Sequence, residues 1–285
     1  MNDQEPLIRN ISDTALWVAH YRAVENDRAD RVFDDPFARR LAGKRGEEIA
    51  GSTTFLKKTA WPFIARTWLI DKMVMEHVAQ GFDTIINLAA GLDTRPYRLS
   101  LPADLQWIEV DLNDILRYKE EILQNEKPRC RLERVTLDLS NRGARQELFK
   151  RLGSQARKAL IITEGLLIYL PQEEVVQVAE ELAAQPSFER WVTDLSSPGL
   201  LQMMNRKMGD AMSRANAPFK FAPEEGPLFF EKYHWKKLEV HSMLRTAANL
   251  KRLPLILKVM SYLFGGKKPN AKSPWSGVCL FGRDS

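Results

Sequence analysis

The sequence predicts an α/β protein whose mostly parallel sheet is covered by helices on both faces. From residue 83 onward, short apolar runs rich in β-branched residues alternate with helix-like stretches. Runs that are apolar on both sides are typical of buried parallel strands. The chain has 285 residues, of which 44% are hydrophobic, so it can bury a sizeable core. The runs are TIINLAA (84–90), QWIEVDL (106–112), RVTLDL (134–139), ALIIT (159–163) and RWVTDL (190–195).

Helices are expected before the first of these strands. Residues 12–25 carry apolar side chains at helical spacing, and a short helix is expected to start at Asp35 with Pro36 in its first turn. Another helix is expected over 62–80, where Gly81 provides the stop signal. This arrangement predicts a helical cap ahead of the sheet.

The last third of the chain is expected to complete the sheet. Residues 236–242 and 275–282 are candidates for the final two strands. The segment 199–235 is rich in methionine, phenylalanine and proline and fits no strand–helix alternation. Because methionine adapts to irregular apolar ligands, we interpret this segment as an insertion that lids a pocket for an apolar molecule, with a second core cluster as the alternative. We expect one domain, made of a helical cap (1–81), a core of alternating strands and helices (82–198) and a region with the insertion and the last strands (199–285).

Charge and cysteine usage limit the partners. The net charge is +5, but Lys and Arg are interspersed with Asp and Glu, which argues against nucleic acid. Cys130 and Cys279 have neither CxxC spacing nor ligand-like spacing to the histidines, so we expect a reducing compartment and no metal site. The first residues lack the features of a signal peptide, which makes the cytoplasm the expected location.

One segment raises the question of membrane contact. Residues 249–272 mix basic and apolar side chains, a composition that peripheral membrane segments also have. Pro254 and the lack of a clean polar face argue against it. A small molecule is the partner that we expect instead.

The turn after the first strand indicates where a ligand would bind. In an open parallel sheet, ligands lie beyond the carboxyl ends of the strands. Ala89, Ala90 and Gly91 form a turn of small residues there, which lets a ligand approach the backbone. The three glycines of a dinucleotide fingerprint are missing, so a pyrophosphate site is not expected. A plain strand-to-helix turn is the alternative.

Two acidic residues end the next two strands. Asp111 follows Gly91 by twenty residues, the spacing at which a carboxylate meets a ribose diol. Glu109 competes for that role from deeper in the strand, and a solvated strand-end carboxylate is the other alternative. Asp138 is placed to accept from an adenine amino group, with Leu139 packed on the ring. Together these residues predict a nucleoside without a diphosphate.

An arginine upstream suggests the rest of the ligand. Arg66 lies on the apolar face of the helix expected over 62–80. A guanidinium group on such a face needs an anion, either a ligand carboxylate or an acidic residue of the chain itself. A nucleoside joined to a carboxylate by a small linker describes S-adenosyl-L-methionine.

At this point the sequence resembles a known family. Residues 86–99 (INLAAGLDTRPYRL), 108–123 (IEVDLNDILRYKEEIL), 136–139 (TLDL) and 163–171 (TEGLLIYLP) are similar to successive motifs of leucine carboxyl methyltransferase-like proteins. That group includes protein carboxyl methyltransferases and bacterial polyketide-type O-methyltransferases. The resemblance runs from about residue 12 to 200. It implies a Rossmann-like class I methyltransferase fold with seven strands, the last one antiparallel.

The resemblance also implies site residues. Gly91 would line the methionine part of the cofactor and Glu164 would lie beside it, while Arg66 would bind the carboxylate and Arg22 would be a weaker candidate for it. Asp111 would hold the ribose, and Asp138 and Leu139 the adenine. The family usually has glycine where Ala89 stands, and often proline where Asn113 stands, so cofactor binding is expected to survive here in a tighter turn.

The chemistry that follows from this is methyl transfer to an oxygen. A carboxylate acceptor needs no general base, whereas a hydroxyl acceptor does, and His234 or His241 would be the places to look. Neither has a supporting partner in the sequence, so no catalytic residue is assigned. The alternatives are a protein C-terminal carboxyl methyltransferase, a catalytically silent methyltransferase-like module and a nicotinamide-dependent dehydrogenase.

The ribose assignment can be tested directly. Replacing the carboxylate in Asp111→Ala should weaken cofactor binding by roughly 1.5–3 kcal/mol, the value of a charged hydrogen-bond acceptor. Calorimetric titration with S-adenosylhomocysteine measures it, and an unchanged affinity would refute the assignment.

Overall fold

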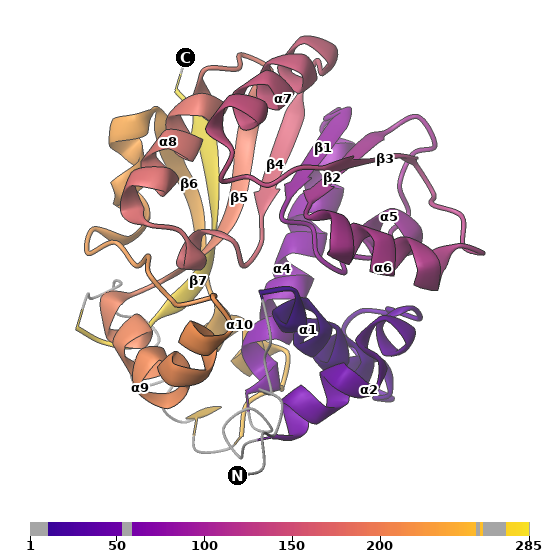
Figure 1. Cartoon of the computed structure of the whole chain (residues 1–285), viewed down its shortest axis with the longest axis vertical. Coiled ribbons are helices and arrows are strands. Elements are labelled where there is room, and N and C mark those ends of the chain that lie inside the picture. The colour runs from indigo at the N-terminus through magenta and orange to yellow at the C-terminus, as the bar shows by residue number, and fades with distance from the viewer. Residues whose placement is uncertain (1–10, 53–58, 255–256, 259–271, 285) are drawn as a thin grey trace.

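The structure, a computed structural model, describes residues 11–52, 59–254, 257–258 and 272–284 (Figure 1). Within these ranges seven strands form one sheet in the order β3-β2-β1-β4-β5-β7-β6. The first five strands run parallel, and β7 lies antiparallel between β5 and β6. The predicted fold class is confirmed. The strands are β1 (Thr84–Leu88), β2 (Gln106–Asp111), β3 (Arg131–Thr136), β4 (Ala159–Thr163), β5 (Phe188–Ser196), β6 (Trp235–Ser242) and β7 (Ser276–Arg283).

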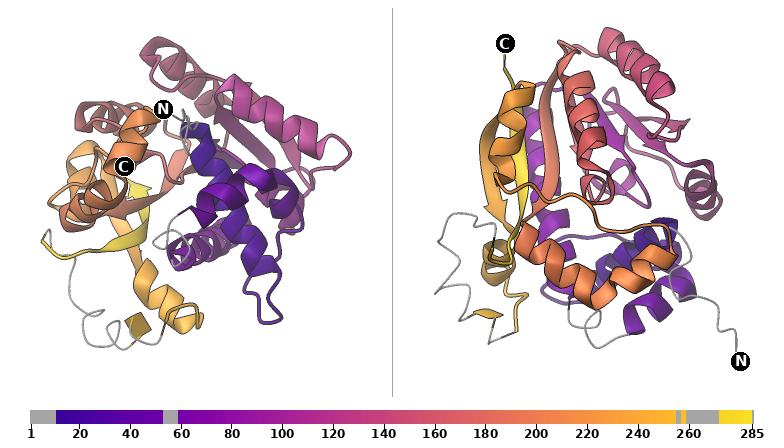
Figure 2. Two further views of the ribbon diagram at one scale, coloured as in Figure 1. Left: turned by 60° about the horizontal axis from the view of Figure 1, so that its bottom comes forward. Right: turned by 60° about the vertical axis from the view of Figure 1, so that its left-hand side comes forward.

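Helices cover both faces of the sheet because its central strands are apolar on both sides. Every residue of β1 and β4 is buried. On one face, Ile86 and Ile161 pack with α7 (Arg142–Gln155) and α8 (Gln172–Ala183). On the other, Ile85 and Leu160 pack with α4 (Ala60–Ala79) and α10 (Met243–Asn249). Figure 2 shows helices on both sides of the sheet. The alternation of side chains along each strand thus builds two separate core clusters.

The N-terminal helices form a cap, as expected. Helix α1 (Ile11–Asn26) packs against α2 (Ala38–Gly51), and both share an apolar cluster with α6 (Asn113–Leu123). Helix α2 begins at Ala38 and not at Asp35. Asp35 instead holds the turn before the helix, where its Oδ1 accepts from the Phe37 N–H at 3.3 Å and its main-chain oxygen accepts from the Ala38 N–H at 3.2 Å. Helix α6 begins at Asn113, a position that tolerates the proline common in the resembling family.

The segment 199–235 is more regular than predicted. Helix α9 (Pro198–Arg214) occupies its first half, with Pro198 in the first turn and the Ser197 hydroxyl accepting from the Leu200 N–H. A 3-10 helix, η2 (Gly226–Tyr233), follows. The prediction of no strand–helix rhythm was therefore wrong: Leu201, Met204, Met208 and Met212 recur at helical spacing and pack in one apolar cluster. Helices α1, α2 and α9 gather at one end of the sheet (Figure 1).

Most of the segment considered for membrane contact, 255–256 and 259–271, lies outside the described residues. Among the helices of the described ranges, none combines the length and the apolar character needed to cross a bilayer.

Candidate functional site

A cavity of about 580 Å³ lies at the carboxyl ends of the parallel strands. This volume is within the range of small-molecule sites, roughly 300–1,000 Å³. Residues from α1, α4, α9 and the turns after β1, β2, β3, β4 and β5 line it. All the residues predicted to bind a cofactor meet here, namely Arg66, Ala89, Gly91, Asp111, Asp138, Leu139 and Glu164, and Arg22 joins them. Their roles as ligands stay predictions.

The turn after β1 is strained at one position. Gly91 has a φ of +50°, which suits glycine, and a Cβ there would lie 3.3 Å from the Cβ of Ala15. Ala89 has a φ of +55°, in the left-handed region that disfavours residues with a Cβ. Alanine at position 89, where the family usually has glycine, therefore raises the conformational energy of the backbone.

Asp111 holds this turn in place. One carboxylate oxygen accepts from the Gly91 N–H at 2.6 Å and the other from the Leu112 N–H at 2.7 Å. Burial raises the pKa of Asp111 against the lowering effect of these two bonds. Glu109, the competing candidate, is fully buried away from the cavity and pairs with Lys119 at 2.7 Å, so that alternative was wrong.

Asp138 shares the cavity with Asp111, but it does not end a strand. Strand β3 stops at Thr136, and Asp138 lies two residues further, in a turn where it accepts from the Ser140 N–H at 2.9 Å. Its side chain is exposed, while Leu139 is partly buried beside it. Asp111 at the end of β2 and Asp138 in the turn after β3 therefore line the same cavity.

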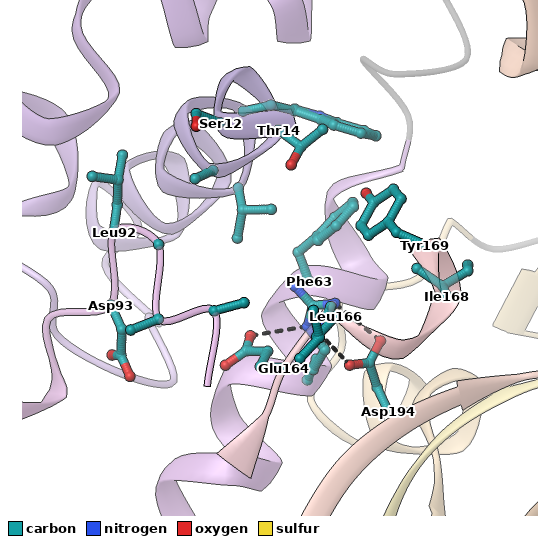
Figure 3. Close-up of a pocket in the computed structure, with 18 of the residues that line it drawn as sticks. Ser12, Thr14, Phe63, Leu92, Asp93, Glu164, Leu166, Ile168, Tyr169 and Asp194 are labelled. Atoms are coloured by element: carbon teal, nitrogen blue, oxygen red, sulfur yellow. Dashed lines mark hydrogen bonds and ion pairs between the residues drawn. The ribbon is translucent and has the colours of Figure 1, made fainter. Parts of the chain in front are cut away.

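Arg66 makes the internal ion pair that was the alternative to a ligand carboxylate. Its Nε donates to Glu164 at 2.9 Å and its Nη1 to Asp194 at 3.1 Å, bonds that Figure 3 shows as dashed lines. Glu164 is held from its other side by Nη1 of Arg95 at 2.8 Å. A chain Arg95–Glu164–Arg66–Asp194 thus crosses the floor of the cavity.

The chain of charges continues into the cap. Arg95 also pairs with Asp71 at 2.7 Å and with Asp93 at 2.9 Å. Arg98 bonds both carboxylate oxygens of Asp71, at 2.6 and 2.7 Å. Asp35 accepts from Arg22 and from Thr94, each at 2.8 Å. We call these residues the arginine network: Arg22, Asp35, Arg66, Asp71, Asp93, Arg95, Arg98, Glu164 and Asp194.

Sequence reasoning assigned only Arg22, Arg66 and Glu164 of this network and missed Asp35, Asp71, Asp93, Arg95, Arg98 and Asp194. Asp194 was signalled by RWVTDL, in which an acid precedes a leucine as in QWIEVDL and RVTLDL. Arg95 begins α5 (Arg95–Arg98), a helix of one turn, and the Asp93 carboxylate accepts the first N–H of this helix at 2.9 Å.

The network sets the ionisation of its acids. Burial alone would raise the pKa of Glu164, but the charges of Arg95 and then Arg66 outweigh it and hold that pKa below the usual value. Burial is likewise overcome at Asp93, mainly by Arg95, and the pKa of Asp93 is lowered to about 2. These carboxylates stay charged at neutral pH.

The cavity carries an excess of negative charge. Among the described residues that line it, five carboxylates face four guanidinium groups. Asn87 adds a polar atom without a partner: its side chain is buried, Nδ2 donates to Asp93 at 2.7 Å, and Oδ1 has no hydrogen bond within the described structure. A buried acceptor in this state costs roughly 1–3 kcal/mol. The cavity therefore suits a ligand with positive charge and a hydrogen-bond donor.

The region beyond Glu164 is apolar. Met203, Met204 and Met208 of α9 line it, together with Phe63 and Tyr169. Figure 3 shows Phe63, Ile168 and Tyr169 on the side opposite Leu92 and Asp93. The predicted insertion thus contributes Met203, Met204 and Met208 to the cavity. It also forms the second core cluster that was the alternative, in which Met208, Met212 and Phe219 pack together, while Phe221, Phe229 and Phe230 pack in the main core.

Neither histidine considered as a base lines the cavity. His234 is an exposed residue that ends η2, and His241 pairs with Glu239 at 2.7 Å on the edge strand β6. Neither histidine is therefore placed to act as a base in this cavity.

Known proteins are similar to this chain in sequence. Residues 15–183 match the family model described as "Leucine carboxyl methyltransferase". A protein of Frankia alni named "Putative S-adenosyl-L-methionine-dependent methyltransferase" is 31% identical over 206 residues, which cover 70% of this chain and 70% of that protein. A protein of the same name from Mycobacteroides abscessus is 34% identical over 208 residues, covering 69% of this chain and 64% of that protein.

Solved structures are similar in fold. A DUF574 family protein from Streptomyces avermitilis has a TM-score of 0.59 at 10% identity, and the match covers 95% of this chain and 97% of the chain of that protein. A structure from Thermobifida fusca described as a "putative methyltransferase" has a TM-score of 0.58 at 13% identity, with coverage of 99% and 97%. At these identities the likeness concerns the fold alone.

The strain at Ala89 predicts a stabilising substitution. Ala89→Gly should raise the free energy of unfolding by about 0.5–1 kcal/mol, because relief of the positive φ exceeds the entropy lost by glycine. Ala90→Gly is the matched control, since Ala90 has no positive φ and should lose about 0.5–1 kcal/mol. Urea unfolding measures both, and equal losses in the two variants would contradict the strain.

The lowered pKa of Asp93 predicts acid sensitivity. In the unfolded chain this carboxyl takes up its proton near pH 3.9, and in the folded protein only near pH 2. About 2–3 kcal/mol of stability should therefore be present above pH 4 and be lost between roughly pH 4 and pH 2. Urea unfolding across this range should show a shallower pH dependence in Asp93→Asn, and an unchanged dependence would argue against the assignment.

Proposed function

The chain belongs to the leucine carboxyl methyltransferase family, and we propose that it is an S-adenosylmethionine-dependent O-methyltransferase with a small hydrophobic acceptor. The family match confirms the resemblance seen in the motifs. The acceptor would carry a carboxyl or hydroxyl group, as the apolar lining beyond Glu164 and the family's chemistry suggest. We keep the cytoplasm as the proposed location.

One observation supports the cofactor most strongly: the acids of adjacent strands line one cavity that has an excess of negative charge. S-adenosylmethionine carries a sulfonium, an ammonium and a carboxylate, and hence a net positive charge. Opposite charge in a partly desolvated cavity favours such a ligand. The names of the relatives, which refer to the same cofactor, agree with this assignment.

The residues of the cavity fit the parts of this cofactor. Asp111 would accept from the ribose hydroxyls, and Asp138 and Leu139 would contact the adenine. Oδ1 of Asn87 would accept from the ammonium group, which would satisfy its missing hydrogen bond. Arg66 would bind the carboxylate through Nη2, since its Nε and Nη1 already donate to Glu164 and Asp194 in the described structure.

When bound, the cofactor supplies an electrophilic methyl group on sulfur. The chain contributes by orientation: the arginine network fixes the floor of the cavity, and α9 and η1 (Leu167–Tyr169) surround the space where an acceptor oxygen would approach. Holding two reactants in line is worth up to roughly 7–11 kcal/mol. The mechanism is then mainly positioning.

The test is calorimetric titration with S-adenosylhomocysteine. The protein should bind it stoichiometrically, and Asp111→Ala should weaken binding as stated above, with a further loss from the freed Gly91 N–H. Asp114→Ala, an exposed acid of the same helix end, is the matched control and should leave affinity unchanged. Absence of binding in the wild type would reject the proposal.

Two alternatives share the cofactor and differ in turnover. A protein carboxyl methyltransferase would label a peptide with a free C-terminal carboxylate from tritiated S-adenosylmethionine, and a silent module would bind S-adenosylhomocysteine and label no acceptor. The methionine-lined space, part of a cavity of about 580 Å³, favours a small acceptor over a peptide end.

A further inference from the structure

Asp194 lies on the acceptor side of the cavity. The residues assigned to the cofactor follow β3, β2, β1 and β4, which are consecutive neighbours in the sheet. Strand β5 comes next, and Asp194 near its carboxyl end lies one strand beyond Glu164. A methyl group presented near Glu164 would therefore point toward Asp194.

The Asp194 carboxylate is held rigidly. Its Oδ1 accepts from the Gly165 N–H at 2.6 Å, and its Oδ2 accepts from Nη1 of Arg66 at 3.1 Å. A carboxylate offers about four acceptor positions, so two anchoring bonds leave capacity for a ligand. The side chain is 16% exposed and lines the cavity, so its carboxylate oxygens can accept a hydrogen bond from an acceptor molecule there.

Apart from the Arg66 guanidinium group, hydroxyls and apolar side chains surround Asp194. Tyr169 lies on the same side of the cavity (Figure 3). Burial raises the pKa of Tyr169 to about 12, so its hydroxyl stays neutral at neutral pH. Ser196 and Ser276 line the adjacent part, and Met203 and Met204 close it from α9. This surrounding suits a neutral, apolar molecule that bears one hydroxyl group.

We propose that Asp194 receives the hydroxyl group of the acceptor, and that the acceptor is an alcohol or phenol and not a carboxylic acid. The inference rests on the proposed function and names its substrate class. It also replaces the two histidines as the group that handles the proton.

The transfer conserves atoms, electrons and charge. A lone pair of the acceptor oxygen forms the new bond to the methyl carbon, and the sulfur–methyl bond breaks with its electron pair passing to sulfur, which becomes a thioether. The acceptor oxygen becomes strongly acidic as it gains the methyl group. Its proton passes to a carboxylate oxygen of Asp194, which becomes a carboxylic acid.

An acceptor carboxylate would meet repulsion at this place. It would lie against the charge of Asp194 in a cavity whose described lining already has more carboxylates than guanidinium groups. Like charges brought together in a desolvated site oppose binding and create specificity against the charged ligand.

The experiment compares 4-pentylphenol with 4-pentylbenzoate, which share an apolar body. Their binding to the protein saturated with S-adenosylhomocysteine is read from tryptophan fluorescence, because Trp17 and Trp61 line the cavity. The phenol should bind at least about tenfold more tightly than the benzoate. Asp194→Asn should remove that preference, chiefly by improving benzoate affinity.

Turnover gives the second readout. Asp194→Asn should lower the rate of phenol methylation by about 100-fold or more, with a much smaller change in KM, since a general base contributes roughly 10²–10⁴-fold. Glu181→Gln is the matched control, because Glu181 pairs with the buried Arg145 outside the cavity. It tests whether loss of a buried ion pair alone lowers the rate.

The outcomes are distinct. Suppose that the wild-type protein binds S-adenosylhomocysteine but prefers the benzoate, methylates the benzoate, or binds neither compound. Each of these results overturns the role of Asp194 and leaves the proposed function intact. The role of Asp194 is also overturned if Asp194→Asn keeps its S-adenosylhomocysteine affinity and methylates the phenol within threefold of wild type. If that variant does not fold, the wild-type preference between phenol and benzoate decides.

Discussion

The placement of Glu164 between Arg66 and Arg95 is the interaction on which the site depends. Its two carboxylate oxygens are bonded at 2.9 and 2.8 Å to arginines from α4 and from the turn after β1. Three segments that are distant in sequence are thereby fixed at the end of β4. Each of the two arginines has further acidic partners, since Arg66 also pairs with Asp194 and Arg95 with Asp71 and Asp93. The floor of the cavity is therefore rigid before any ligand arrives.

The same ionic system attaches the cap to the core. Asp35, between α1 and α2, bonds Arg22 of the cap and Thr94 of the core turn. Near the other end of the chain, Arg252 pairs with Glu25 at 2.7 Å, so α1 is also joined to the segment after α10. The cap is positioned by ion pairs as well as by apolar contacts, and these interactions together hold helix α1 against the cavity.

Two local costs accompany this rigidity, and both lie at the cavity. Ala89 adopts a positive φ, and Oδ1 of Asn87 is buried without a hydrogen bond in the described structure. Strain and unmet polar groups of this kind cluster where ligands bind, because a ligand can supply the missing contact. Their position next to the Gly91 turn agrees with the cofactor placement derived from the strand-end acids.

The sequence by itself determined the alternation of strands and helices, the small-residue turn and the acids near the strand ends, because these depend on neighbours a few residues apart. Burial on both faces of TIINL and ALIIT, and the spacing from Gly91 to Asp111, required no tertiary knowledge. Only the tertiary structure decided that Arg66 meets Glu164 and Asp194, which lie 98 and 128 residues away, and that Glu109 turns from the cavity toward Lys119. Such pairings follow from how separate elements pack, since an ion pair is selected by distance in space and not by separation along the chain.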